Sequence, residues 1–275
     1  MNGVWKLTSN SSYFWGISTM HHEREHFTLL NDYTWSFSFN FDGKAAESRL
    51  HLKPVPGRHW RWIRSTDRDS ESLTYDPATE ETWIGYEGSS SIRRYSPRLG
   101  RQVGWVAPPL MRRWPENAGP EAMVRLADGR FIVFSEEADG PQSSHAAVMF
   151  PGDPVLNPRS GTEFFYRPPP GYDATDAAQL PDGRVLVLNR HFSLLDGLSA
   201  ALTLVDPRDI APERIVDGRI VAILAAPLTV DNMEALSVER SKAGKVVIWI
   251  MSDDNFNPLQ QTLLMKFTLD PAQIR

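Results

Sequence analysis

Residues 119–137 read GPEAMVRLADGRFIVFSEE: an acid, an apolar run, an Asp-Gly turn, and a second apolar run that ends in acids. Residues 174–190 repeat this order as ATDAAQLPDGRVLVLNR. An Asp-Gly pair between two strongly β-forming runs indicates a tight β-hairpin. The two stretches therefore predict the same supersecondary unit twice.

Further copies of this unit cover residues 69–87 and 231–255, and a weaker first copy has Trp15 where the others have an acid. The acids that begin the four stronger copies are 50, 55 and 58 residues apart, at Glu71, Glu121, Asp176 and Glu234. Repeats of this length suit the four-stranded blades of a β-propeller. We therefore predict one all-β propeller domain over residues 1–275. It has five four-stranded blades, and a sixth from the termini and residues 150–171 stays open.

The composition narrows the classes of function. A net charge of −5 without a basic stripe argues against a nucleic-acid partner. Cysteine is absent, which excludes disulfides and thiolate metal ligands. No apolar run approaches the roughly 18 residues of a membrane span. The oligomeric state stays open.

Polar residues flank the two inner strands of each predicted blade. The first strand begins, and the second ends, at the same end of the channel, so both sets of residues are expected at one mouth. The first set is Glu71, Glu121, Asp176 and Glu234. The second set is Asp32, Glu87, Glu136, Arg190, Asp253 and Asp254, with Asn255 just after it.

So many carboxylates at one mouth cannot all stay ionised unless positive charge compensates them. Calcium accepts six to eight oxygen ligands in irregular geometry and would do this. We therefore expect a calcium site with ligands from Glu71, Glu121, Asp176, Glu234, Asp253 and Asp254. The alternative is that each acid accepts hydrogen bonds from backbone N–H groups at a strand start.

Over nearly its whole length the chain resembles the phytase-like family, described as "esterase-like activity of phytase"; the likeness is weakest before Trp15 and most specific near the C-terminus. Residues 231–237, DNMEALS, are similar to its D-N-x-E-G-L-x element, with Ala235 in place of the glycine. Residues 252–264, SDDNFNPLQQTLL, are similar to its S-D-D-N-F-x-x-x-Q-x-T-L-L element. A weaker likeness covers residues 180–190.

This resemblance implies a β-propeller that hydrolyses phosphoric esters, with a small anionic or ester substrate. Arg190 would pair with phosphate oxygens, His191 would contact the phosphate or act as an acid, and Glu234 and Asp254 would be catalytic. The family also implies export to the periplasm or outside the cell, although a cytoplasmic location stays open. Two other functions remain: a non-catalytic binding propeller with a structural cation, and a calcium-dependent lactonase or carboxylesterase.

Residues 22–26, HEREH, match the H-E-x-x-H pattern of zinc proteases. That pattern binds zinc only on a helix, where positions i and i+4 share a face. Here it lies where the other copies have their tight turn, and a β-forming run follows at once. We expect an exposed hairpin turn and no zinc site.

Overall fold

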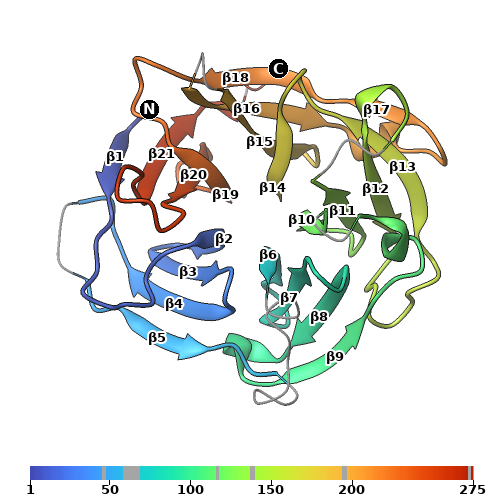
Figure 1. Ribbon diagram of the computed structural model, residues 1–275, viewed down its shortest axis with the longest axis horizontal. Helices are drawn as coiled ribbons and strands as arrows, with labels where there is room; N and C mark the ends of the chain where they lie inside the picture. Colours follow the sequence, from blue (N-terminus) through green and yellow to red (C-terminus); the bar gives the residue numbers. More distant parts are fainter. Residues whose placement is uncertain are drawn as a thin grey trace.

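The computed structural model describes residues 1–44, 48–57, 69–115, 118–136, 140–193, 197–271 and 274. Within these residues the chain forms five sheets arranged as blades around a central channel (Figure 1). The predicted all-β propeller is confirmed. The number of blades, left open between five and six, is five.

The first two blades each contain four consecutive antiparallel strands, with the first at the channel and the last at the perimeter. Blade 1 consists of β2 (Ile17–Glu23), β3 (His26–Asn31), β4 (Trp35–Asn40) and β5 (His51–Pro54). Blade 2 consists of β6 (Ser70–Asp76), β7 (Glu81–Tyr86), β8 (Ser91–Tyr95) and β9 (Gln102–Val106).

Blades 3 and 4 depart from this consecutive strand order at their outer edges. Blade 3 consists of β10 (Pro120–Arg125), β11 (Phe131–Ser135), β12 (His145–Phe150), β13 (Thr162–Arg167) and β17 (Ile215–Asp217). Blade 4 consists of β14 (Asp173–Gln179), β15 (Val185–Ser193), β16 (Gly197–Val205) and β18 (Arg219–Leu224). The strand β17 pairs parallel to β13, so the segment between β16 and β18 reaches back to the preceding blade. The proline-rich residues 150–171 thus supply an outer strand of blade 3 and no blade of their own.

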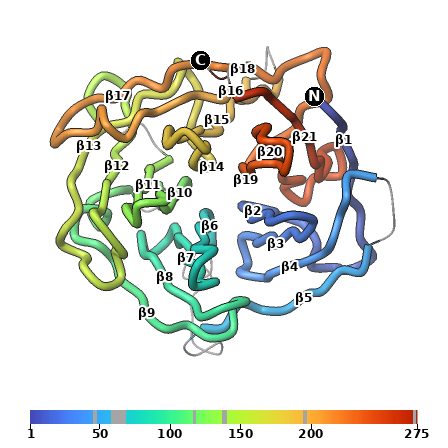
Figure 2. The backbone as a smooth tube through the Cα atoms, turned by 180° about the vertical axis from the view of Figure 1, so that it is seen from behind, coloured from blue at the N-terminus to red at the C-terminus, as the bar shows by residue number. Residues whose placement is uncertain are grey.

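Blade 5 joins the two ends of the chain. It consists of β19 (Asn232–Arg240), β20 (Val246–Asp253), β21 (Leu263–Leu269) and, as the outermost strand, β1 (Gly3–Lys6). The backbone view from behind shows the blue N-terminal strand beside the red C-terminal strands (Figure 2). Since β1 pairs with β21 through four residue pairs, the last blade is completed by the first strand of the chain and the ring is closed.

The hydrophobic core is divided among the spaces between blades. Each of the five clusters of buried residues joins two neighbouring blades. In the cluster between blades 5 and 1, Trp249 packs edge-on against Phe27, with ring centroids 5.0 Å apart. Burying one large apolar side chain contributes about 1.5–3 kcal/mol, so these contacts hold the blades against each other.

The hairpin turns and the polar strand ends lie at opposite ends of the wheel. The turns between the two inner strands use glycines with positive φ in blades 3 and 4, Gly129 (φ 90°) and Gly183 (φ 93°). At the other end, the first residue of β19 pairs with the last residue of β20, Asn232 with Asp253. The predicted gathering of strand starts and strand ends at one mouth is therefore confirmed.

Helical structure in the described residues is limited to short 3-10 turns. These are η2 (Pro97–Leu99), η3 (Met111–Arg113), η4 (Pro141–Ser143) and η5 (Pro207–Asp209). None of them is long and apolar enough to cross a membrane.

Candidate functional site

The mouth of the channel is built by β-bulges in the innermost strands. The pairing of β6 with β7 shifts at Glu71, that of β10 with β11 shifts at Glu121, and that of β19 with β20 shifts at Glu234. A bulge inserts one residue that has no partner across the ladder and re-aims its side chain. Three blades therefore present a glutamate from the same position of the innermost strand.

The other two blades have a hydroxyl residue at the bulge. In β2 the bulge residue is Ser18, whose Oγ donates to the Ser70 carbonyl 2.5 Å away. In β14 it is Thr175, whose Oγ1 donates to the Met233 carbonyl at 3.1 Å. The spacing of the repeats predicted Asp176 at this position, which is one residue after Thr175. In blade 1, the matching residue is Ser18 rather than Trp15.

Because Asp176 follows the bulge residue, its surroundings differ from those of the three glutamates. The two oxygens of its carboxylate accept hydrogen bonds from the backbone N–H groups of Ala177 (2.8 Å) and, in the next blade, Leu236 (2.7 Å). Burial raises the pKa of Asp176 well above its usual range, and these two amides oppose that rise. The structure thus gives Asp176 a role between blades 4 and 5, and it is not a member of the carboxylate groups described next.

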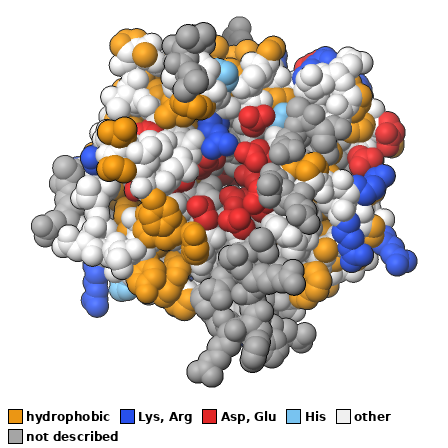
Figure 3. Space-filling view, viewed as in Figure 1, with side chains coloured by type: hydrophobic (Ala, Val, Ile, Leu, Met, Phe, Trp, Pro, Cys, Tyr) orange, Lys and Arg blue, Asp and Glu red, His pale blue; other side chains and the backbone are white. Residues whose placement is uncertain are grey.

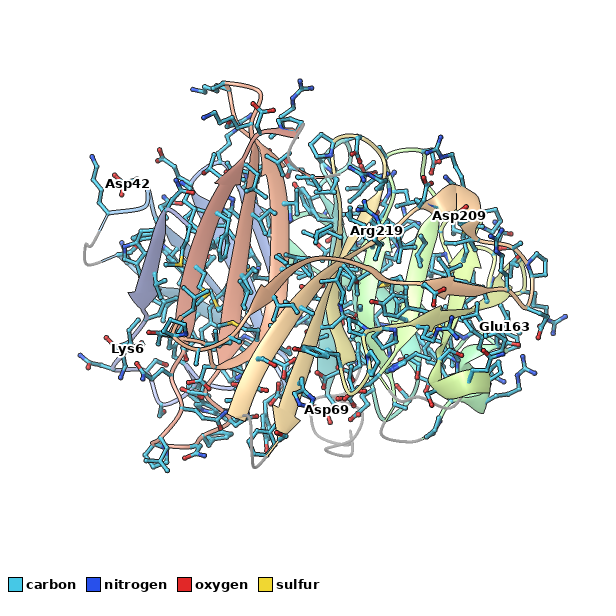
Figure 4. All side chains as sticks on the ribbon, turned by 90° about the horizontal axis from the view of Figure 1, so that it is seen from above. Lys6, Asp42, Asp69, Glu163, Asp209 and Arg219 are labelled. Carbon is cyan, nitrogen blue, oxygen red and sulfur yellow. The ribbon has the colours of Figure 1, made fainter. Side chains whose placement is uncertain are left out.

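Two groups of carboxylates among the described residues are close enough to share a cation. In each group the ligand oxygens lie within 4.8 Å of one another; the first is Asp69, Glu71 and Glu87, and the second is Glu87, Glu121 and Glu136. Glu87 belongs to both. Figure 3 shows the acidic side chains gathered around the central hollow, and Figure 4 shows Asp69 at this end of the wheel, the lower end in that view.

The backbone at Gly119 allows this close approach. A Cβ atom there would collide with the Cα atom of Glu87, so a side chain at position 119 would push the end of β7 away from the start of β10. A glycine is therefore needed for Glu87 and Glu121 to reach the same space.

Burial and mutual repulsion disfavour ionisation of these acids. Burial, followed by the charge of Glu121, raises the pKa of Glu71 well above its usual range. Burial, followed by the charges of Glu136 and Glu234, raises the pKa of Glu121 in the same way. Burial, followed by Asp253, raises the pKa of Asp32 to about 8. The described mouth therefore holds more carboxylates than can be ionised together unless a cation is added.

Arg190 is the cation that the structure brings into this ring of acids. Its Nη1 donates to Glu234 Oε1 (2.5 Å) and Asn232 Oδ1 (2.9 Å), and its Nη2 donates to Glu136 Oε1 (3.0 Å). The Asn232 side chain in turn donates to the same Glu234 oxygen at 2.7 Å. Burial still raises the pKa of Glu234 to about 7, against the opposing effect of Arg190. Sequence reasoning placed Arg190 at this mouth, but it did not anticipate the amide of Asn232.

The remaining predicted residues lie around this ring. Asp253 is buried, and burial raises its pKa to about 6, while the Asn255 amide donates to its carboxylate at 3.0 Å. Asp254 accepts from three groups of surrounding loops, the amides of Gly16 and Phe256 and the Thr262 hydroxyl. The exposed Asn255 forms a left-handed turn with φ 47°.

His191 lies beyond Arg190 on β15. Its Nδ1 is 2.5 Å from the Gly171 carbonyl, and its ring lies 5.1 Å from that of Tyr172. The described contacts of His191 are therefore with the preceding loop, outside the two carboxylate groups.

The H-E-x-x-H segment forms the predicted hairpin. Its residues belong to β2, the two-residue turn and β3. His22 is buried against Phe27 and Trp249, whereas His26 is exposed and contacts Asn40. The two histidines lie on neighbouring strands of a hairpin, where His22 pairs with Phe27 and His26 pairs with Glu23, and they do not share a helical face.

The chemistry of the donor set fits a hard divalent cation. Each group offers three carboxylate oxygens, one from each residue, and oxygen is the ligand atom that hard divalent cations such as calcium prefer. Glu121 is only 7% exposed and, within the described residues, neighbouring charges rather than hydrogen-bond donors dominate its surroundings. A buried carboxylate among like charges is costly unless a cation is close.

Comparison with known proteins supports the fold and the family. The Phytase-like family, described as esterase-like activity of phytase, matches residues 13–256. None of the curated proteins shows significant similarity to the chain. An endo-arabinase from Bacteroides thetaiotaomicron is similar in structure, with a TM-score of 0.60 and 10% identity over 94% of this chain and 95% of that one. A protein from Dyadobacter fermentans has a TM-score of 0.52 and 10% identity over 99% and 84%.

Likeness at 10% identity shows a shared fold alone, whereas the family match extends over most of the chain and includes the strands that supply the carboxylates. This five-bladed propeller belongs to the Phytase-like family.

Proposed function

We propose that the protein is a calcium-dependent hydrolase of phosphoric esters that acts at the carboxylate mouth. The observation that carries this proposal is the pair of carboxylate groups that share Glu87. Membership of the Phytase-like family supports the reaction class. The residues that would hold calcium are Asp69, Glu71, Glu87, Glu121 and Glu136.

Bound calcium would offset the negative charge of a phosphate and lower the pKa of a coordinated water. Without such compensation, the mouth would repel an anionic substrate. Arg190 holds Glu136 and Glu234 in fixed positions through its planar fork, and a quarter of its side chain remains exposed to meet a substrate oxygen.

Glu234 is suited to carry a proton at neutral pH, because its pKa is about 7. Its Oε1 already accepts hydrogen bonds from Arg190 and Asn232. The proton therefore belongs on Oε2, which we assign as the atom that exchanges it during turnover.

The test is hydrolysis of p-nitrophenyl phosphate and p-nitrophenyl acetate by EDTA-treated protein, with and without calcium. Glu121→Gln is the test variant. Glu80→Gln is its control, because Glu80 is exposed at the opposite end of blade 2. We expect calcium-dependent release of phosphate that Glu121→Gln loses and Glu80→Gln retains.

Other outcomes would replace the proposal. Turnover of the acetate alone would indicate a calcium-dependent carboxylesterase. Binding of calcium without turnover of either ester would indicate a non-catalytic propeller in which the cation is structural.

A further inference from the structure

Three aromatic rings lie beside the acidic mouth, of which two are exposed to solvent and the third is half-buried. Trp15 precedes β2, Tyr33 is in the turn between β3 and β4, and Phe256 is in the loop after β20. Tyr33 is 51% exposed and Phe256 is 59% exposed. Figure 3 shows hydrophobic side chains next to the central hollow on the side of blades 1 and 5, left and below in that view. We call Trp15, Tyr33 and Phe256 the aromatic shelf.

The rings of the shelf contact one another. The ring of Trp15 lies directly against that of Phe256 and 4.8 Å from that of Tyr33. Tyr33 and Phe256 are 6.5 Å apart in an edge-to-face arrangement. The Trp15–Tyr33 and Tyr33–Phe256 pairs have the edge-to-face geometry that aromatic pairs prefer, so contacts among the rings hold them together. Tyr33 and Phe256 still expose half or more of their surface to solvent.

The shelf is attached to the ring of acids through neighbouring residues. Tyr33 directly follows Asp32, and the Asp32 amide donates to the Gly16 carbonyl at 3.0 Å. A Cβ atom at Gly16, where φ is 60°, would lie 2.9 Å from Asp32 Oδ2. The start of blade 1 thus packs against the acid and holds Trp15 at its edge.

One carboxylate ties the two loops of the shelf together. Asp254 Oδ1 accepts from the Gly16 amide at 3.4 Å and from the Phe256 amide at 3.3 Å. Phe256 itself has a left-handed backbone, φ 52°, which is uncommon for a bulky residue and costs free energy. The loop therefore holds a large apolar side chain out in solvent at the rim, in a conformation that the chain does not favour by itself.

We propose that the aromatic shelf binds a planar organic group of the substrate while the ester group lies at the carboxylate mouth. This inference rests on the proposed function for the position of the ester, and it adds the substrate class: esters of aromatic or similarly flat alcohols. Asp254 acts here as a positioning residue, because it fixes the loops that carry Trp15 and Phe256.

The first test compares binding of phenyl phosphate and methyl phosphate in the presence of calcium, by ligand-observed NMR. The two ligands share the phosphate and differ in the organic group. We expect phenyl phosphate to bind about 3- to 10-fold more tightly, the range that corresponds to one aromatic contact. Phe256→Ala and Tyr33→Ala are expected to abolish this preference with little change in methyl phosphate binding.

Trp105→Ala is the matched control, since Trp105 is 54% exposed on β9 at the perimeter of blade 2. It should retain the full preference. Equal binding of the two phosphates by the wild type, or a preference that survives in both shelf variants, would overturn the proposal.

A second measurement separates the shelf from the proposed reaction. Phenol has no phosphate, so its binding to calcium-free protein depends on the shelf alone. We expect weak saturable binding that Phe256→Ala removes and Trp105→Ala retains. This result would support the shelf even if no ester were hydrolysed, whereas absence of phenol binding would refute it even if phosphate esters were turned over.

Discussion

Replacing Glu87 by glutamine should change the stability of the propeller in opposite directions without and with calcium. Glu87 is the carboxylate that both clusters share. In calcium-free protein its charge repels the neighbouring acids, so Glu87→Gln should raise the free energy of unfolding. In the presence of calcium the same substitution removes a ligand, so the stabilisation that calcium provides should fall.

The expected magnitude follows from the spacing of the oxygens. Two ionised carboxylates 4.8 Å apart repel each other by about 3.5 kcal/mol at an effective dielectric constant of 20. The protein can relieve most of this repulsion by protonating one of the two carboxylates, which costs about 1.4 kcal/mol for each unit by which the pH exceeds the pKa of that group. A net gain of about 1–2 kcal/mol therefore remains, and it raises the Tm by roughly 2 °C per kcal/mol for a chain of this length.

The assay is thermal unfolding at pH 8 of the wild type, Glu87→Gln and Glu80→Gln, each in EDTA and in saturating calcium. Calcium at about 100 times its Kd should stabilise the wild type by roughly 2.7 kcal/mol. Glu80→Gln should behave like the wild type under both conditions. A lower Tm for Glu87→Gln in EDTA, or an undiminished calcium shift, would refute the reasoning.

Three further predictions concern the rest of the mouth and the core. Because burial raises the pKa of Asp32 to about 8 and of Glu234 to about 7, the folded calcium-free protein holds protons that the unfolded chain has already lost. Its stability in urea should therefore fall as the pH rises from about 4.5 to about 8, and a rise would contradict these pKa shifts. Asp176→Asn leaves one of two buried amides without an acceptor and should cost about 1–3 kcal/mol in urea unfolding with the calcium shift unchanged; loss of that shift would make Asp176 a ligand. Tyr166→Phe removes the buried hydroxyl that contacts Asn189 and Thr203. It should cost about 1–3 kcal/mol in the same assay, and an unaltered midpoint would show that these groups find other partners.

The periodic part of the structure could be predicted from the sequence. The Asp-Gly turns and the spacing of the acids identify a propeller, because each blade repeats the same hairpin with the same polar ends. The same reasoning placed Glu71, Glu121 and Glu87 at one mouth, where the structure brings them together.

The register at the bulges could not be predicted. A shift of one residue turns a side chain to the other face of a strand, and a bulge produces this shift without any change in composition. Thr175 rather than Asp176 therefore occupies the bulge of blade 4. The sequence of residues 150–171 likewise gives no sign that this stretch belongs to blade 3. Nor does it show that β17, from a distant part of the chain, pairs with β13.

The central claim is that the carboxylate mouth binds calcium, and titration calorimetry of calcium into EDTA-treated protein tests it most directly. We expect saturable binding by the wild type and by Glu80→Gln, and a loss of that binding in Glu121→Gln. Absence of calcium binding by the wild type, or equal binding by Glu121→Gln, would contradict the account and leave Arg190 and protonation as the means by which these acids are accommodated.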